Sequence, residues 1–589
     1  MKVFLQKYWK TELSFLFGVT VFFFWGYCYS AHLSYQEQFQ LFLMNVDYFL
    51  ERAAIPGGIA DYIAEYLTQF YYYPWLGAFI LALFFMAFQR LVWWIAQRQG
   101  AVDEYYLLSF LPAIALWHFM EDENVMLSFA IALLMTLLVI LGYIHLNKKC
   151  ERGIYILFLL PLLYWIAGPL HLIFMGWVII YGLQRCFRHK KLLNGVGLIL
   201  GLGILGFCIP MLMCIWLQYP LYRLLSGLNY YRFPEVMPFM EVCIALCSLI
   251  LPFVMATLPR IKKKKIFYEL LLTVFFVGTS CYFIIRACDM NKEEAMRYDY
   301  WVKKSMWNKI ISAAEKKAPD SPFTVTCLNL ALAKTGQLGD RMFEFYQNGT
   351  EGLLPEFQRD FTSPLPTGEA FYQLGMINTA QRFAFEAMEA IPNFRKSSRC
   401  YKRLAETNII NGQYKVASKY LQALSETLFY RSWAKDAMTY LYNENKINSH
   451  PEWGRLRQLR YTDDFLFSDR EIEVMLGLLV EHNYKNKMAF EYMLAYVLEK
   501  KDIPTFMKYY PLGKKLGYDH IPRSYQEALV YVWTQSHPSF QGMPWSISPQ
   551  IMEAIADFAR IYTQQPNSES MLKPKYGGTY WYYYLFRNN

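Results

Sequence analysis

The first 290 residues consist largely of long apolar runs separated by short polar loops, and this pattern restricts the fold more than any other feature. A helix that crosses a bilayer needs about 20 mostly apolar residues, because lipid offers its backbone no hydrogen-bond partners. The runs therefore predict a polytopic helical membrane domain. We place its nine spans at residues 12–32, 74–96, 104–119, 124–146, 153–168, 170–186, 193–217, 238–258 and 266–286, with a re-entrant hairpin as the alternative for 153–186.

Lysine and arginine collect in alternate loops of this domain. With a cytoplasmic N-terminus, the inner loops hold 17 of them, whereas the outer loops hold only Arg52, Arg223 and Arg232. Positively charged loops stay in the cytoplasm, so an odd number of spans places the C-terminal half outside. For a bacterial protein this predicts an inner-membrane location and a periplasmic C-terminal domain. Many basic residues thus lie in short clusters between apolar runs and not in a basic groove, so we expect no nucleic-acid partner despite the net charge of +10.

The sequence predicts an all-α protein in three parts, namely the membrane domain at 1–290, helical repeats at 291–445 and a further helical region at 446–589. Gly375, Ala380, Ala387 and Pro392 have the spacing of the second half of a tetratricopeptide (TPR) repeat, and Gly412 with Ala417 repeats its first interval. Such repeats form an α-solenoid whose concave surface binds a protein or peptide. The alternative is a solenoid that only supports the membrane domain.

The chain ends in an unusually aromatic segment at residues 580–586. So many exposed rings would form a large apolar patch, which soluble proteins rarely leave uncovered. We therefore expect this tail to dock on protein or on the membrane.

The first outer loop, residues 33–73, is long and acidic. Glu37, Gln40, Asp47 and Glu51 recur at helical spacing between Tyr35 and Arg52, and residues 56–58 (Pro-Gly-Gly) then break the helix. Asp61, Glu65 and Thr68 repeat the pattern on a second helix. We expect two amphipathic helices at the membrane surface, with Glu37 and Asp47 as candidate catalytic carboxylates.

The second outer loop is very short and contains Glu121, Asp122 and Glu123 in succession. Acids so close to hydrocarbon are costly and are candidates for function, here as ligands of a divalent metal. The alternative is a turn that simply faces bulk water. The last outer loop contains Arg223 and Arg232 among several tyrosines, which either form an interfacial belt or surround arginines that bind a substrate phosphate.

This layout resembles the GT-C class of glycosyltransferases, multi-span enzymes that use a polyprenyl-phosphate-linked sugar donor at the outer face. The class typically has an acidic residue early in a long first outer loop, and some members have a second acidic motif after the third span. In this sequence Glu37 and residues 121–123 hold those positions, although Glu37 replaces the customary aspartate. The chain is also similar to an uncharacterised bacterial family of multi-span proteins with C-terminal TPR-like repeats, a similarity that implies no activity.

Three functional hypotheses follow. The first is transfer of a sugar from a polyprenyl-phosphate carrier to an acceptor on the outer face, with Glu37 facing the turn at residues 121–123 across one cavity. The second is a non-catalytic, membrane-anchored TPR scaffold that recruits envelope proteins. The third, a transporter, ranks last because the spans contain few polar residues. No P-loop, dinucleotide-binding fingerprint, HExxH or nucleophile elbow is present.

Overall fold

The computed structural model describes residues 2–188, 192–260, 265–358, 360, 362–462, 471–564 and 568–587. These residues form helices joined by loops and contain no β-strand, only one isolated antiparallel bridge between Val125 and Tyr231. The all-α prediction is therefore confirmed. The basic residues Lys190, Lys191 and Lys262 to Lys264, which helped to define the predicted topology, lie outside the described residues.

The chain divides into two compact units. The first unit contains the residues up to Glu293 together with two short segments from the second half of the sequence, Pro392–Ser397 and Glu426–Arg431. The second unit contains Glu294–Ile391, Ser398–Ser425 and Ser432–Asn589. The two returning segments are a feature that the sequence analysis did not anticipate.

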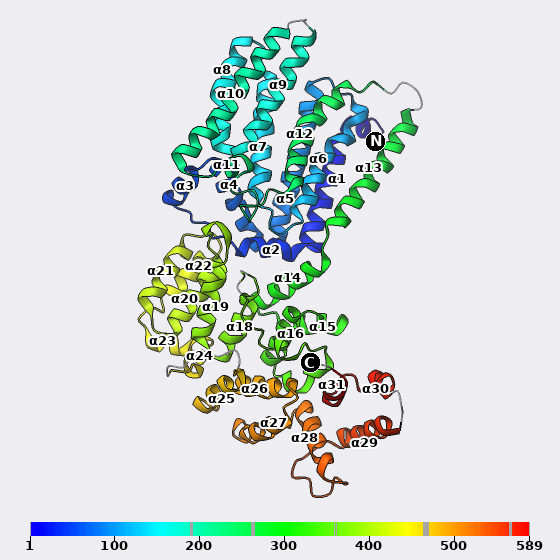
Figure 1. Ribbon diagram of the computed structural model, residues 1–589, viewed down its shortest axis with the longest axis vertical. Coiled ribbons are helices and arrows are strands. Elements are labelled where there is room, and N and C mark those ends of the chain that lie inside the picture. The colour runs from blue at the N-terminus through cyan, green and yellow to red at the C-terminus, as the bar shows by residue number, and fades with distance from the viewer. Residues whose placement is uncertain are drawn as a thin grey trace. The chain divides into compact units, whose positions relative to one another are not determined.

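The first unit is a bundle of long helices (Figure 1). Short helices connect them, and α2 runs crosswise at one end of the bundle. The helices are α1 (Lys2–Phe23), α2 (Ser30–Gln38), α3 (Val46–Ala53), α4 (Gly58–Thr68), α5 (Pro74–Arg98), α6 (Leu111–Met120), α7 (Leu127–His145), α8 (Lys149–Ala167), α9 (His171–Arg188), α10 (Leu192–Leu217), α11 (Leu221–Ser226), α12 (Phe239–Thr257) and α13 (Lys265–Ala287).

Several of these helices can cross a membrane, as the apolar runs predicted. Within the described residues, seven segments are long and apolar enough to do so. They are Tyr8–Cys28, Pro74–Arg98, Leu127–His145, Lys149–Cys186, Gly195–Leu217, Phe239–Thr257 and Leu270–Ala287.

Two predicted regions account for the difference between seven segments and nine predicted spans. The segment Lys149–Cys186 consists of α8 and α9, helices of 19 and 18 residues that pack against each other and meet at Gly168. Each has the length of a complete crossing. The predicted span at 104–119 is instead a 3-10 helix, Asp103–Phe110, followed by α6, which has only 10 residues. If α8 and α9 are counted as two spans and α6 is included, the number of spans is nine, as predicted.

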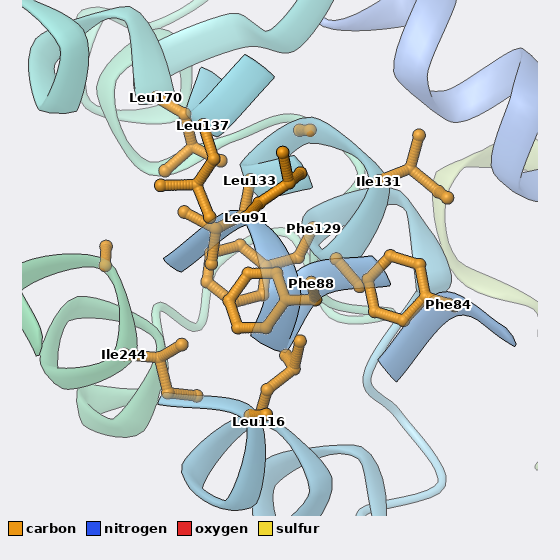
Figure 2. Close-up of a cluster of buried hydrophobic side chains, with 14 of the residues drawn as sticks. Phe84, Phe88, Leu91, Leu116, Phe129, Ile131, Leu133, Leu137, Leu170 and Ile244 are labelled. Atoms are coloured by element: carbon orange, nitrogen blue, oxygen red, sulfur yellow. The ribbon is translucent and has the colours of Figure 1, made fainter. Parts of the chain in front are cut away.

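The core of the first unit lies around α5 (Figure 2). Phe84, Phe88 and Leu91 from α5 meet Phe129 of α7 and Ile244 of α12, and all of these side chains are buried. In contrast, no residue of the apolar segment Leu270–Ala287 in α13 is buried. In the most apolar segment of α5, 61% of the residues are buried. An apolar helix that contributes no buried residue from this segment suits lipid and not water, which agrees with a membrane-spanning role.

The predicted first outer loop differs from the expected pair of surface helices. The single helix expected between Tyr35 and Arg52 is divided into α2 and α3, because the Asn45 side chain accepts a hydrogen bond from the backbone N–H of Tyr48 at 2.7 Å and caps α3. The same Asn45 donates to the Glu426 carboxylate at 2.5 Å. The acidic stripe of α4, formed by Asp61, Glu65 and Thr68, is buried within protein.

Aromatic contacts hold the returning segment Glu426–Arg431 in the first unit. The Phe429 ring stacks on Tyr72 with centroids 5.3 Å apart, and the rings of Phe70 and Tyr73 meet it edge-on. Arrangements of this kind stabilise packing beyond the area that they bury. The segment is therefore an integral part of the first unit, although it is distant in sequence.

The second unit is built from shorter helices that pack in successive pairs, including α15 with α16, α18 with α19, α20 with α21 and α25 with α26. Its helices are α15 (Trp307–Lys316), α16 (Pro322–Lys334), α17 (Leu338–Arg341), α18 (Pro364–Leu374), α19 (Ile377–Glu389), α20 (Ser398–Ile410), α21 (Tyr414–Ser425), α22 (Arg431–Met438), α23 (Glu444–Ser449), α24 (Trp453–Leu459), α25 (Ile472–His482), α26 (Lys487–Glu499), α27 (Ile503–Tyr509), α28 (Arg523–Ser536), α29 (Pro549–Gln564), α30 (Ser568–Tyr576) and α31 (Tyr580–Phe586), with α14 (Met290–Lys303) leading in from the first unit.

The aromatic tail docks on protein, as predicted. It forms α31, in which Tyr580 and Trp581 are fully buried. The Trp581 indole donates to the Glu527 carbonyl at 2.7 Å, and the Tyr583 hydroxyl donates to the Glu499 carbonyl at 3.1 Å. The C-terminal helix thus completes the core of the second unit.

Candidate functional site

Three segments of the first unit meet around the acidic turn that follows α6. The Gln36 side chain of α2 donates to the Val125 carbonyl at 3.0 Å. On the other side of the turn, the backbone N–H of Arg232 donates to the Asn124 carbonyl at 2.8 Å, and that of Met126 donates to the Tyr230 carbonyl at 2.9 Å. We call this group the acidic-turn site, and define it by Gln36, Glu121, Asp122, Glu123, Arg232 and Lys292.

The three acids of the turn have separate environments. Asp122 accepts a hydrogen bond from the Tyr231 hydroxyl at 2.8 Å, and Glu123 forms an ion pair with Lys292 at 2.8 Å. Glu121 is buried and engages neither residue. Asp122 and Glu123 therefore have different partners, and Glu121 shares neither of them. Within the described residues, no group of three or more His, Cys, Asp or Glu side chains is arranged to hold a metal ion.

Glu121 is the most unusual of the three. Its side chain is only 4% exposed, and among the described residues its carboxyl oxygens have no cationic or backbone hydrogen-bond partner, only the Cys288 thiol, a weak donor, nearby. Burial raises the pKa of Glu121 to about 8, and the nearby Cys288 thiol opposes the rise. A carboxyl group with a pKa near neutrality can both accept and release a proton, as a general acid–base catalyst must.

The start of α2 is held by a different acid. The carboxylate of Glu293 accepts hydrogen bonds from the backbone N–H groups of Ala31 and His32 at 2.9 and 3.0 Å. It thereby satisfies the donors that a helix leaves unpaired at its N-terminus. The His32 ring beside it is buried, and burial lowers its pKa to about 3, so the ring is neutral at pH 7.

Arg232 provides a buried positive charge at this site. Its guanidinium lies over the Phe39 ring, 5.1 Å from the centroid, and is directed toward the Glu123 carbonyl at 3.4 Å. Burial lowers the pKa of Arg232 to about 10, which still leaves the side chain charged at pH 7. A cation in a partly dehydrated setting interacts strongly with an anion, because the local dielectric is low.

A second cluster of buried charges lies on α4, and we call it the α4 acid pair after Asp61 and Glu65. Arg395, from the returning segment Pro392–Ser397, donates to Asp61 at 3.0 Å and to Glu65 at 2.6 Å. Arg52 of α3 approaches Glu65 at 3.1 Å. Asp61, Glu65 and Arg395 are each 5% exposed or less. Two acids and two arginines therefore balance one another away from water.

Neutral groups complete the α4 acid pair. The Ser128 hydroxyl donates to Asp61 at 2.6 Å and the Asn229 amide donates to its other oxygen at 2.8 Å. The Tyr48 hydroxyl donates to Glu65. Burial and the neighbouring Asp61 raise the pKa of Glu65, whereas Arg395 and Arg52 oppose the rise. With these partners the pair has the character of a structural network.

The predicted site residues fall into different places. Glu37 is buried in α2, one residue after Gln36, whose side chain contacts the Val125 carbonyl. Asp47 is exposed in the first turn of α3 and belongs to neither cluster. Arg223 donates to the Asn393 side chain at 2.9 Å, and so has a different environment from Arg232. The two arginines expected to bind one phosphate thus have separate partners.

Sequence reasoning missed Arg395, Glu293 and Lys292. The stripe that contains Asp61 and Glu65 was visible from its helical spacing, but its partner Arg395 lies more than 300 residues later in the chain. No local pattern links residues so distant, and a single sequence holds no signal that pairs them. Lys292 and Glu293 stand immediately after the last apolar run, where basic and acidic residues are ordinary.

The chain was compared with known proteins and structures. No curated protein of assigned function matches it, and neither does any solved structure. A family model described as "Family of unknown function (DUF6057)" matches residues 7–587, which is nearly the whole chain. This protein therefore belongs to the DUF6057 family.

Proposed function

We propose that this protein is a membrane-embedded glycosyltransferase of the GT-C type, which transfers a sugar from a polyprenyl-phosphate carrier to an acceptor on the outer face. The observation that carries the proposal is the buried carboxyl group of Glu121, without a cationic partner, at the point where α2, the acidic turn and the loop before α12 meet. A buried acid of this kind is costly to stability, so its presence favours a chemical role.

In the proposed reaction, Glu121 acts as general base on the acceptor hydroxyl. The hydroxyl oxygen attacks the anomeric carbon of the donor sugar while its proton passes to the Glu121 carboxylate. The bond between the anomeric carbon and the phosphate oxygen breaks, and polyprenyl phosphate leaves with the bonding electron pair. We propose Glu121 as the base in place of Glu37, which the GT-C resemblance favoured, because Glu121 is buried without a cationic partner, and we keep Glu37 as a candidate second carboxylate.

Arg232 is the residue best suited to stabilise the leaving phosphate. It is buried, it remains charged at pH 7, and it belongs to the same site as Glu121. An arginine held ready for developing negative charge is worth more in a dehydrated site than in water. His32 is neutral and therefore does not repel a cation or compete for the phosphate.

The proposed topology places the acidic-turn site and the second unit outside the cytoplasmic membrane of a bacterium. The distribution of basic residues supports it, as does the exposed apolar surface of α13. We further propose that the second unit contains TPR-like repeats. In support, Ala380 and Ala387 are buried on α19, and Gly375 ends α18 in the left-handed conformation with φ 94°.

The test is an assay of purified full-length protein in lipid vesicles with radiolabelled polyprenyl-phosphate mannose and polyprenyl-phosphate glucose as donors. Release of the label into the aqueous phase, on water or on added glycan, reports transfer. Glu121→Gln should lower the rate by about a hundredfold or more, the usual contribution of a general base. Glu123→Gln, on the same turn but paired with Lys292, is the matched control and should keep most of the rate.

Equal rates for the two variants would remove Glu121 from the mechanism. Absence of transfer by the unmodified protein with both donors would overturn the proposal and leave the membrane-anchored scaffold as the better hypothesis.

A further inference from the structure

The second unit contains two adjoining cavities between α26, α28, α29 and the loop that follows α27. One has a volume of about 660 Å³ and the other of about 740 Å³. Gln526 and Ser548 line both, and the Ser548 N–H donates to the Gln526 side chain at 2.8 Å. The two cavities therefore lie on either side of a shared Gln526–Ser548 wall, and we call the two together the groove. Each volume falls within the range of about 300–1,000 Å³ that ligand sites usually occupy.

Aromatic rings line the first cavity. Tyr510, Tyr518 and Trp545 are each half-buried and present ring surface to it. Tyr518 is positioned by its hydroxyl, which donates to Glu491 at 3.3 Å, and Trp545 meets the edge of Trp533 at 6.3 Å. Rings that are fixed in place and partly exposed offer a flat, rigid contact surface at low entropic cost.

A buried polar atom in the same wall lacks a partner. Tyr525 is only 1% exposed, and its hydroxyl has no hydrogen-bond partner among the described residues. Leaving such a group unpaired costs stability.

The second cavity is polar and carries more negative than positive charge. Its walls include the acids Asp340, Glu527, Glu553 and Asp557 against the two bases Arg523 and Lys575. Carboxylates and side-chain amides such as Gln526 accept hydrogen bonds from neighbouring hydroxyl groups. Asp557 already pairs with Lys575 and Glu527 with Arg523, and the remaining excess of acids would repel an anionic ligand.

We propose that this groove binds a neutral oligosaccharide. The C–H face of a sugar ring packs on an aromatic ring, and its hydroxyls bind carboxylates and amides, so the paired cavities offer both halves of sugar recognition. The assignment of this oligosaccharide as the acceptor of the transferase rests on the proposed function. The binding of an oligosaccharide in the groove does not depend on that function.

The experiment measures binding to full-length protein in a detergent without a sugar head group, since a maltoside would compete. Maltohexaose, mannohexaose and chitohexaose are the probes, and isothermal titration gives Kd. At least one probe should bind, and Trp545→Ala should weaken it by about tenfold or more, as for a central aromatic contact. Trp545→Phe should retain part of the affinity. Trp433→Ala, another half-buried tryptophan of the same unit outside the groove, is the matched control.

The proposal is overturned if none of the three probes binds with a Kd below about 10 mM, or if Trp545→Ala and Trp433→Ala have equal effects. Tighter binding of a lysine-rich octapeptide would also overturn it, because the acidic cavity would then serve a basic peptide. Failure of the transferase proposal has a different signature, namely sugar binding that depends on Trp545 in a protein that transfers no sugar.

Discussion

The acidic-turn site and the α4 acid pair hold buried carboxyl groups in the same unit, but they treat the charge in opposite ways. Asp61 and Glu65 are matched by Arg395 and Arg52 and by three neutral donors. Glu121 is also buried but has no cationic partner. The comparison teaches that burial alone does not identify a reactive acid, because compensation of its charge decides whether the group is held inert or ready to exchange a proton.

The sharpest way to break this comparison is to remove Arg395. Arg395→Met would leave two carboxylates buried beside Arg52 alone, and breaking a buried ion pair in this way costs about 3–5 kcal/mol. We expect a large loss in the unfolding temperature of the full-length protein in detergent, followed by circular dichroism. Arg382→Ala removes an exposed pair with Glu386 and should cost less than about 1 kcal/mol.

A compensating variant tests the cause of that loss. Arg395→Met combined with Asp61→Asn and Glu65→Gln removes the charges together, so stability should return in large part. If the triple variant is as unstable as Arg395→Met, the loss arises from packing of the returning segment and not from uncompensated charge.

The sequence indicated much of the fold because its strongest signals are local. Apolar runs predicted the membrane-crossing helices, and the buried tail residues Tyr580 and Trp581 followed from composition alone. The break between α2 and α3 was missed, although Asn45 caps α3 through the backbone N–H of Tyr48, and the contact of Asn45 with Glu426 could not be read from local sequence. The 104–119 region was apolar enough for a span but forms a 3-10 turn and a short helix.

The candidate site was less accessible to sequence reasoning. The proximity of α2 to the acidic turn depends on tertiary contacts such as that between Gln36 and Val125. Which acid of residues 121–123 lacks a partner depends on Tyr231 and Lys292, which lie over 100 residues away. Composition can identify an acidic turn, but only the three-dimensional environment distinguishes its members.

A pH titration sharpens the comparison from the other side. The folded-state pKa of Glu121 is about 8, above the ordinary value of about 4.3 that applies in the unfolded chain. The folded protein therefore holds one more proton between these values. The stability that this proton provides is full below about pH 4 and falls as pH rises toward 8, by up to about 1.4 kcal/mol per pH unit.

Glu121→Gln removes this dependence. The variant should be more stable than the unmodified protein at pH 8, with the advantage shrinking toward pH 5, as measured by unfolding temperatures at the two pH values. If the variant is less stable at both pH values, the Glu121 carboxylate has a stabilising partner. Glu121 would then be a compensated acid like Asp61 and Glu65 of the α4 acid pair.

The smallest effect is expected for Glu123→Gln, two residues further along the same turn. Glu123 pairs with Lys292, whose side chain is 55% exposed, so solvent and salt already screen the interaction. The substitution keeps the shape of the side chain and should cost no more than about 1 kcal/mol, with the difference vanishing in 1 M salt. Unfolding temperatures at low and high salt measure this directly. A cost as large as that of Arg395→Met would show that an exposed pair on the acidic turn is as tightly coupled as the buried α4 acid pair, and the distinction drawn between the two sites would fail.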